Sequence, residues 1–192
     1  MTHIASMRRE FILGGQRSGK SRAAETRAGA WLGTKGHSAV LLATALAGDD
    51  EMRARIAQHR ADRAVRVAGL ASVEVPRDLP GALGEHSSVQ QLVVIDCLTL
   101  WLTNLLMPLH GEALADAPLA QVRREFIDAL QAAPGPLVIV SNEIGLGLSP
   151  MTREARRFVD ELGRLHQLVA ATCERVTLMV AGVAVAVKGG RA

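Results

Sequence analysis

The chain has no tyrosine, and only three phenylalanines and two tryptophans among its 192 residues. Proteins that bind single-stranded nucleic acid use aromatic side chains as stacking platforms, so this scarcity argues against that class. It also means that the core must be built from Val, Leu, Ala and Ile, which suits a parallel sheet covered by helices.

Cysteines and long apolar runs are also scarce. Cys97 and Cys173 lie far apart and without the spacing of a metal site, so we expect buried thiols in a reducing compartment. The longest apolar run, Val176 to Val187, is too short to cross a bilayer. Near Arg8, Arg9 and Glu10 there is no apolar stretch of the kind found in a signal peptide. We therefore expect a cytoplasmic protein without a membrane span.

Charge of either sign is not in large excess. The 22 Lys and Arg residues against 19 Asp and Glu leave a formal charge of +3, and the arginines are dispersed. A solvated surface accounts for this pattern as well as a nucleic-acid patch does. The length allows one well-buried core but not two ordinary domains, so we predict a single nucleotide-binding domain over residues 1–192, with 1–9 as an N-terminal extension.

Short apolar runs alternate with longer amphipathic segments along the chain, which is typical of repeated β–α units. Strands are predicted at Glu10–Leu13, Ser38–Ala43, Ser72–Val75, Leu92–Ile95, Leu137–Val140, Val176–Val180 and Val183–Val187. Helices are predicted at Ser18–Leu32, Asp49–Asp62, Cys97–Met107, Leu119–Ala132 and Pro150–Glu174. The pattern predicts an α/β fold with a mostly parallel, doubly wound sheet flanked by helices.

A phosphate-binding loop follows the first predicted strand. The segment 14–21 reads GGQRSGKS, a G-x-x-x-x-G-K-S motif between a strand and a helix. Gly14 and Gly19 allow tight turns that aim backbone N–H groups at one point, beside the positive end of the helix. Lys20 can then reach the β- and γ-phosphates, and the Ser21 hydroxyl can hold Mg²⁺. The residues expected to bind phosphate are Gly14, Gly15, Gln16, Arg17, Ser18, Gly19, Lys20 and Ser21.

Asp96 ends the apolar run Leu92–Ile95, so its carboxylate should emerge at the same edge of the sheet as the phosphate loop. There it can hold the Mg²⁺ that Ser21 contacts. Aspartate is also a favoured N-cap, and a cap for the helix starting near Cys97 is the alternative.

Asn142 and Glu143 follow another buried strand and precede a Gly145-x-Gly147 loop. They too should reach the ligand edge, and the loop from Gly145 to Pro150 is flexible enough to close over a substrate. A connector without a functional role fits the sequence equally well.

Glu51, Arg55 and His59 share one face of a predicted helix, because they fall at positions i, i+4 and i+8. A neutral imidazole beside arginines can attack phosphorus while the guanidiniums hold phosphate oxygens. On its own such a histidine is more often a solvated helix residue. The same interpretation applies to the remaining histidines, His3, His37, His86, His110 and His166.

Four segments together resemble one family. They are GGQRSGKS, the LLATA strand with DDEMRARIAQHR after it, VVIDCLTLWLTNLL, and VSNEIGLGLSP before the last long helix. In this order, from about Phe11 to Lys188, they are similar to the bifunctional adenosylcobinamide kinase/adenosylcobinamide-phosphate guanylyltransferases of cobalamin biosynthesis.

The resemblance implies a RecA-like P-loop fold, a homotrimer and two reactions. Composition adds the expectation of a cytoplasmic protein with no nucleic-acid partner. The first reaction phosphorylates adenosylcobinamide with ATP or GTP, and the second transfers GMP from GTP to that phosphate through a GMP–histidine intermediate. By the same resemblance His59 and Lys20 are catalytic, and Mg²⁺ is held by Ser21 and Asp96. Nucleotide-binding residues beyond the phosphate loop are implied to be Thr44, Ala45, Arg60, Arg63, Glu74 and Asp96.

The chain departs from the family pattern in two places. The R-P-x-x-W stretch that usually follows the nucleophile helix is absent after Arg63, and His166 stands where asparagine is commoner. Two other interpretations of the phosphate loop stay open. One is a small-molecule kinase without a covalent nucleotide step, and the other is a RecA-like ATPase that binds nucleic acid or a partner protein.

Overall fold

The structure is a computed structural model that describes residues 8–190, except for the side chains of Arg55 and His59. The strands are β1 (Arg9–Gly14), β2 (Ser38–Ala43), β3 (Leu70–Glu74), β4 (Gln91–Asp96), β5 (Leu137–Asn142), β6 (Arg175–Val180) and β7 (Val183–Lys188). The helices are α1 (Lys20–Leu32), α2 (Asp50–Arg66), α3 (Leu79–His86), α4 (Leu98–Leu106), α5 (Asp116–Ala132) and α6 (Arg153–Thr172). Most of the expected extension 1–9 lies outside the described residues, whereas Arg9 belongs to β1.

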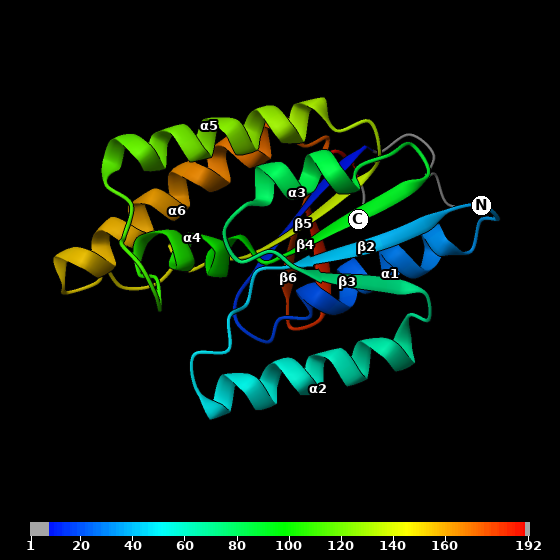
Figure 1. Cartoon of the computed structure of the whole chain (residues 1–192), viewed down its shortest axis with the longest axis horizontal. Helices are drawn as coiled ribbons and strands as arrows, with labels where there is room; N and C mark the ends of the chain where they lie inside the picture. The colour runs from blue at the N-terminus through cyan, green and yellow to red at the C-terminus, as the bar shows by residue number, and fades with distance from the viewer. Residues whose placement is uncertain (1–7, 191–192) are drawn as a thin grey trace.

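The seven strands form one sheet in the order β3-β2-β4-β5-β1-β6-β7. Strands β1 to β6 pair in parallel, and β7 joins β6 antiparallel. β5 lies between β1 and β4, so the carboxyl ends of these three strands meet at one edge (Figure 1). Ligands of open α/β sheets bind at this edge. The predicted mostly parallel sheet is confirmed.

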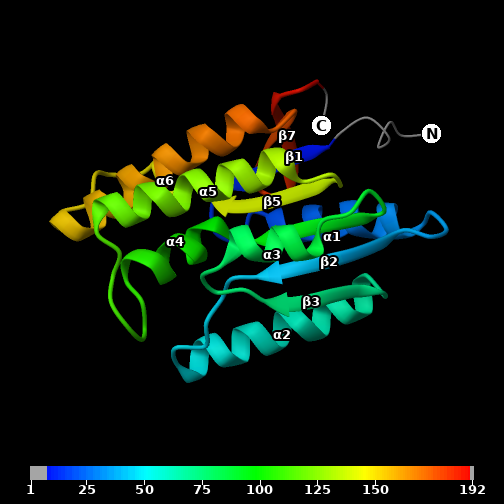
Figure 2. The ribbon, with the colours of Figure 1, turned by 45° about the horizontal axis from the view of Figure 1, so that its top comes forward.

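Helices cover both faces of the sheet (Figures 1 and 2). Because side chains alternate along a strand, Val93 and Ile95 of β4 pack in a cluster with α3, α4, α5 and α6. The intervening Leu92 and Val94 pack in a second cluster with α1. α2 lies beside α1 and β3, and its Arg66 pairs with the buried Glu25 of α1 at 2.8 Å.

Helix α3 is absent from the sequence-based prediction, because its sequence LPGALGEH contains a proline and two glycines. The structure tolerates these residues since the proline occupies the first turn, where its missing N–H is not needed. Asp78 caps the helix by accepting a hydrogen bond of 2.9 Å from the backbone N–H of Gly81. Leu79 and Leu83 are buried in the core, which stabilises the short helix.

The helix boundaries also differ in part. α2 extends beyond the predicted Asp62 to Arg66, and α6 begins at Arg153, after the predicted start at Pro150. Cys97 and Cys173 are free and buried, as predicted, and burial raises the pKa of each thiol to about 12. No helix within residues 8–190 has the length and apolar character needed to cross a membrane.

Candidate active site

The phosphate loop connects β1 to α1 and depends on two glycines. Gly14 has φ +155, and a Cβ there would lie 2.5 Å from the backbone oxygen of Met179 and 2.6 Å from Ser18 Oγ. Gly19 has φ +98 and occupies the N-cap position of α1 without a side-chain cap. The first N–H groups of α1 are therefore directed into the loop, an arrangement that suits a phosphate. The turn between β6 and β7 supports the loop, since Gly182 N donates to Ser18 O over 3.0 Å.

Lys20 is buried at the start of α1. Its Nζ donates to the Gly15 carbonyl over 2.6 Å and lies 3.4 Å from Ser18 Oγ. Burial lowers the pKa of Lys20 below its ordinary value, and the nearby Cys97 and Asp96 oppose this shift. The ammonium group is thus held against the phosphate loop itself, where it can contact a bound phosphate.

Ser21 and Asp96 come together across α1 and β4, as predicted. The Ser21 hydroxyl donates to Asp96 Oδ2 over 3.1 Å. The N-cap of α4 is Cys97, so Asp96 does not occupy the capping position, and that alternative is wrong. A hydroxyl and one carboxylate beside a phosphate loop fit Mg²⁺, which is usually held by one or two carboxylates together with substrate phosphates. Among the described side chains, which exclude His59, no group of three or more His, Cys, Asp or Glu forms a metal site made of protein ligands alone.

Thr44 is hydrogen-bonded to the backbone of Cys97, the residue that follows β4. Its hydroxyl donates to the Cys97 carbonyl over 2.7 Å and accepts from the Cys97 N–H over 2.8 Å, and the residue is fully buried. The Asn104 side chain donates to the Thr44 carbonyl over 2.7 Å. Thr44 therefore positions the backbone next to Asp96, and the half-buried Ala45 follows it at the ligand edge.

Arg60 and Glu74, both predicted to bind nucleotide, form an ion pair between α2 and the end of β3. In the register of the sheet, Glu74 pairs with Ala43 of β2, and Ala43 pairs with Asp96 of β4. The pair is thus at the same edge of the sheet as Asp96, two strands away. Arg63 is buried one turn further along α2.

His59 lies within α2, but its side chain is outside the described part of the structure. The helix begins with a regular cap, since Asp49 accepts a hydrogen bond of 2.7 Å from Met52 N. The spacing of Glu51, Arg55 and His59 on one helix face therefore remains a prediction.

A buried polar cluster at the end of β5 was not predicted. His166 of α6, expected to be solvated, is only 7% exposed, and its Nε2 lies 2.8 Å from Ser141 Oγ. The ring packs edge-on against Phe11 with centroids 5.4 Å apart. Its Nδ1 is 3.6 Å from Glu143 Oε2. The signal was the apolar stripe of α6, because His166 is one turn after the buried Leu162.

His37 also differs from the solvated residue expected, because its half-buried ring stacks on Trp31 with centroids 3.8 Å apart. His37 lies in the turn before β2 and Trp31 near the end of α1, so the pair is at the opposite end of β2 from Thr44. It therefore has no contact with the site.

A hollow of about 210 Å³ lies next to the site. Residues of the loop after β5 and of α6 line this hollow. The loop contributes Ile144, Gly145, Gly147, Leu148, Ser149 and Pro150, and α6 contributes Arg156, Val159 and Asp160. Leu148 of this lining exposes most of its apolar side chain, as do its neighbours Leu146 and Met151 in the same segment of the chain.

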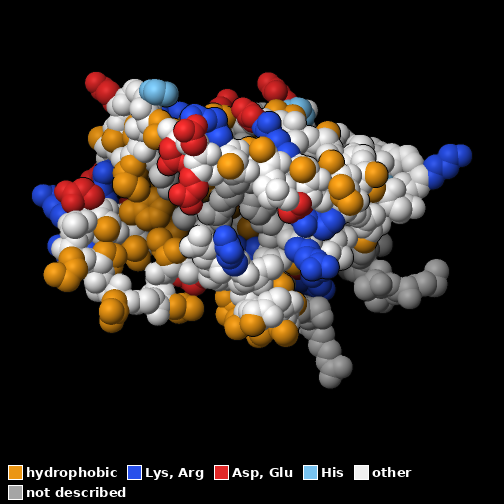
Figure 3. All heavy atoms as spheres, turned by 90° about the horizontal axis from the view of Figure 1, so that it is seen from below, with side chains coloured by type: hydrophobic (Ala, Val, Ile, Leu, Met, Phe, Trp, Pro, Cys, Tyr) orange, Lys and Arg blue, Asp and Glu red, His pale blue; other side chains and the backbone are white. Residues whose placement is uncertain are grey.

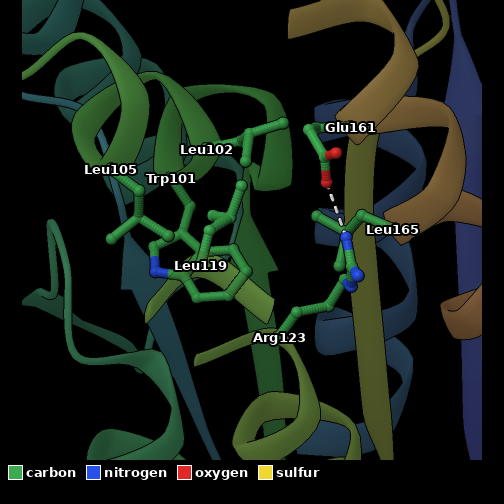
Figure 4. A pocket seen from close by; sticks show the side chains of 7 residues that line it. All are labelled: Trp101, Leu102, Leu105, Leu119, Arg123, Glu161 and Leu165. Carbon is green, nitrogen blue, oxygen red and sulfur yellow. Dashed lines mark hydrogen bonds and ion pairs between the residues drawn. The ribbon is translucent and has the colours of Figure 1, made fainter. Parts of the chain in front are cut away.

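A second gap, of about 10 Å³, lies between α4, α5 and α6 (Figure 4). It is no larger than the space for one water molecule, and Trp101, Leu119 and Leu165 are among its lining residues. Arg123 and Glu161 close it with an ion pair of 2.6 Å. This gap belongs to the core packing and leaves the carboxyl edge of the sheet as the candidate site.

Charged side chains of both signs are interspersed on the face shown in Figure 3. This face does not present an unbroken basic field of the kind that binds nucleic acid.

Comparisons with known proteins agree with this geometry. The family model described as cobinamide kinase / cobinamide phosphate guanyltransferase matches residues 10–187. The bifunctional adenosylcobalamin biosynthesis protein CobP of Pseudomonas aeruginosa is 45% identical over 183 residues, covering 94% of this chain and 98% of that protein. The protein CobU of Salmonella typhimurium is 34% identical over 186 residues, covering 93% and 98%.

Two solved structures share the fold at low sequence identity. The flagellar accessory protein FlaH of Methanocaldococcus jannaschii has a TM-score of 0.50 at 13% identity, covering 95% of this chain and 80% of its own. The protein PH0250 of Pyrococcus horikoshii has a TM-score of 0.55 at 7% identity, covering 96% and 87%.

Proposed function

The chain belongs to the cobinamide kinase / cobinamide phosphate guanyltransferase family, and from this premise we propose that it catalyses both reactions in cobalamin biosynthesis. It first phosphorylates the aminopropanol hydroxyl of adenosylcobinamide with ATP or GTP. It then transfers GMP from GTP to the new phosphate, which gives adenosylcobinamide-GDP and pyrophosphate.

The contact of Ser21 with Asp96 is the observation that carries the kinase proposal. It brings a hydroxyl and a carboxylate together beside the phosphate loop and Lys20. Phosphoryl transfer needs positioning and charge neutralisation more than covalent help. Ser21 and Asp96 would hold Mg²⁺, which when bound neutralises charge on the phosphates. Lys20 and the N–H groups of the loop would hold the phosphate oxygens in place.

For guanylyl transfer we propose a covalent route through His59. An imidazole nitrogen attacks the α-phosphorus of GTP, a nitrogen–phosphorus bond forms, and the bond to the bridging oxygen breaks with release of pyrophosphate. A phosphate oxygen of the corrinoid then attacks the same phosphorus, and the nitrogen–phosphorus bond breaks. Two displacements spare the enzyme from aligning GTP and a bulky corrinoid phosphate at the same moment. Support comes from the resemblance of the α2 sequence to the guanylylated segment of the family.

The other nucleotide contacts are proposed at Ala45, Arg60, Arg63 and Glu74, near the ends of β2 and β3. Thr44 was expected among them, but it is fully buried and its N–H, hydroxyl and carbonyl are hydrogen-bonded to Asp96, Cys97 and Asn104, so it shapes this edge without contacting the nucleotide. An ion pair already links Arg60 to Glu74, and an arginine freed from such a pair can hold phosphate oxygens in a bidentate manner. A homotrimer, a cytoplasmic location and a single nucleotide-binding domain follow from the resemblance and from composition, and they stay predictions.

Two labels test the proposal. Phosphate from γ-labelled ATP should appear in cobinamide phosphate, and label from α-labelled GTP should stay on the denatured protein. Phosphorylation without protein labelling would favour a small-molecule kinase that lacks the covalent step. ATP hydrolysis stimulated by DNA, without cobinamide phosphorylation, would favour a nucleic-acid ATPase.

A further inference from the structure

Glu143 is held at the ligand edge by contacts on both of its carboxylate oxygens. Oε1 accepts a hydrogen bond of 2.7 Å from Gly145 N, and Oε2 lies 3.6 Å from His166 Nδ1. The backbone N–H of Glu143 donates to the carbonyl of Gly14, the first residue of the phosphate loop, over 3.0 Å. The carboxylate is therefore fixed next to the place where the phosphates of a nucleotide bind.

The polar contacts behind Glu143 form a chain with one consistent direction. A backbone N–H can only donate, so the Thr99 hydroxyl accepts from Asn142 N over 2.9 Å. A carboxylate can only accept, so the 3.6 Å contact between His166 Nδ1 and Glu143 Oε2, which is longer than a hydrogen bond, has the Nδ1–H directed toward the carboxylate. Burial lowers the pKa of His166 despite the nearby Glu143, so the ring is neutral and its Nε2 accepts the Ser141 proton. Thr99 then donates to Ser141 over 3.0 Å, and every donor points toward Glu143.

Such a chain is costly to bury unless each member is satisfied. Ser141 is fully buried, Thr99 is 9% exposed, and both hydroxyls have partners. The Glu143 carboxylate is the last member of this chain of contacts. At 23% exposed, the Glu143 side chain is also its most exposed member. The buried members thus orient one partly exposed carboxylate.

Glu143 reaches the ligand edge from the side of the sheet opposite to Asp96. Ile139 of β5 packs in the cluster that contains α6, and Val140 packs in the cluster that contains α1. Contact with His166 places Glu143 on the α6 side, whereas contact with Ser21 places Asp96 on the α1 side. The hollow of about 210 Å³ begins at Ile144, the next residue, so an acceptor has room on the α6 side.

We propose that Glu143 is the base of the kinase reaction, with His166 as the residue that positions it. The carboxylate accepts the proton of the cobinamide hydroxyl while that oxygen forms a bond to the γ-phosphorus. The bond from the γ-phosphorus to the bridging oxygen breaks, and the nucleoside diphosphate leaves with the electron pair. An in-line transfer requires attack opposite the leaving oxygen, so a base on the α6 side requires the leaving oxygen to face away from that side. This inference rests on the proposed function.

The two reactions differ in their need for a base. An alcohol keeps its proton at neutral pH, so its attack on phosphorus benefits from a base by about 10²-fold or more. A phosphate monoester has a second pKa of about 6 and is already largely ionised at neutral pH. Loss of the Glu143 carboxylate should therefore slow phosphorylation far more than guanylyl transfer.

The test is Glu143→Gln in the full chain, with each reaction assayed separately. Phosphorylation is measured with adenosylcobinamide and γ-labelled ATP, and guanylyl transfer with cobinamide phosphate and GTP. We expect the kinase kcat to fall by about 10²-fold and guanylyl transfer by less than about threefold. Glu154→Gln makes the same chemical change at an exposed position in the first turn of α6 and should leave both rates unchanged.

A pair of His166 variants tests the positioning role. The amide nitrogen of His166→Asn can take the place of Nδ1 and still donate to Glu143. The longer side chain of His166→Gln can replace the Nε2 contact with Ser141 but loses the donor to Glu143. We expect His166→Gln to lower the kinase kcat by about tenfold at an unchanged KM for ATP, and His166→Asn to restore most of it. If His166 had only a structural role, the two variants would have the same kinase kcat whenever their thermal stabilities are equal.

The outcomes separate the inference from the proposed function. If the unmodified chain makes no cobinamide phosphate, the proposed function fails. If it does, and Glu143→Gln keeps its kinase rate within about threefold, the inference is wrong and the function stands. Equal loss of both reactions in Glu143→Gln would also overturn the inference, since it would indicate general damage to the site.

Discussion

The Ser21 hydroxyl donates to Asp96 Oδ2 over 3.1 Å, which connects the phosphate loop with the end of β4. The two residues are 75 positions apart in the chain, and parallel pairing of β1, β5 and β4 brings them together. Both are oxygen ligands that suit a hard cation such as Mg²⁺. Their contact shows that the fold itself brings the two proposed Mg²⁺ ligands close together.

Asp96→Asn should raise the Mg²⁺ concentration needed for half-maximal kinase activity, by about tenfold or more. The physical reason is that an amide is a poorer ligand for a hard cation than a carboxylate. The measurement is a Mg²⁺ titration of the initial rate at saturating nucleotide. Asp78→Asn, at the cap of α3, is the matched control, because asparagine caps a helix as well as aspartate does. An unchanged titration for Asp96→Asn would contradict the metal role.

Lys20→Ala should abolish phosphorylation and weaken nucleotide binding, because it removes a charge from the phosphates without removing an apolar side chain from the core. We expect a loss of at least about 10²-fold in kinase kcat/KM, with circular dichroism and thermal unfolding close to those of the unmodified chain. Lys35→Ala, at an exposed position in the turn after α1, controls for the loss of a positive charge. Kinase rates near the original value in a folded Lys20→Ala protein would refute the assignment.

Most of the sheet is predictable from the sequence because its strands are short apolar runs with clear limits. Ser38–Ala43 is one such run, and the structure reproduces both of its boundaries. The ligand edge is predictable too, since parallel strands place their carboxyl ends together. Glu143 was expected there, and its contact with the Gly14 carbonyl confirms the placement.

The features that sequence patterns missed depend on tertiary contacts. α3 contains residues that break most helices, and it is held by Asp78 and by burial of Leu79 in the core. His166 was expected in solvent because its partners, Ser141 and Glu143, come from a different element. The hydrophobic periodicity of one helix does not reveal which residues of another element it packs against. The contact of His166 in α6 with Ser141 and Glu143 at the end of β5 was therefore not predictable in this way.

The stability of the fold should depend on pH through His166. Burial lowers the pKa of this side chain in the folded state, from an ordinary value of 6.5. The unfolded chain therefore binds more protons than the folded chain once the pH falls below about 6.5, and the free energy of unfolding decreases in that range. One such group contributes at most about 1.4 kcal/mol per pH unit.

Urea unfolding at several pH values between about 7 and 5 measures this dependence, and the range is set by the ordinary pKa of histidine. His166→Asn cannot bind the proton, so its free energy of unfolding should fall less steeply as the pH decreases. Comparing slopes removes the constant cost of changing a buried side chain. Parallel curves for the two proteins would show that His166 is not responsible.

The final prediction is that His59→Ala removes guanylyl transfer and leaves the kinase reaction, whereas Glu143→Gln is expected to slow the kinase reaction and leave guanylyl transfer. Cobinamide phosphorylation should persist, while protein labelling by α-labelled GTP and formation of the GDP-corrinoid should disappear. A phosphoramidate on histidine is lost in acid and stable in alkali, whereas a phosphoester on a hydroxyl such as that of Ser21 would resist acid. Lys20→Ala should impair both reactions if one nucleotide site serves them. If α-labelled GTP still labels the His59→Ala protein in an acid-labile bond, the nucleophile is another residue and the covalent role of His59 is wrong.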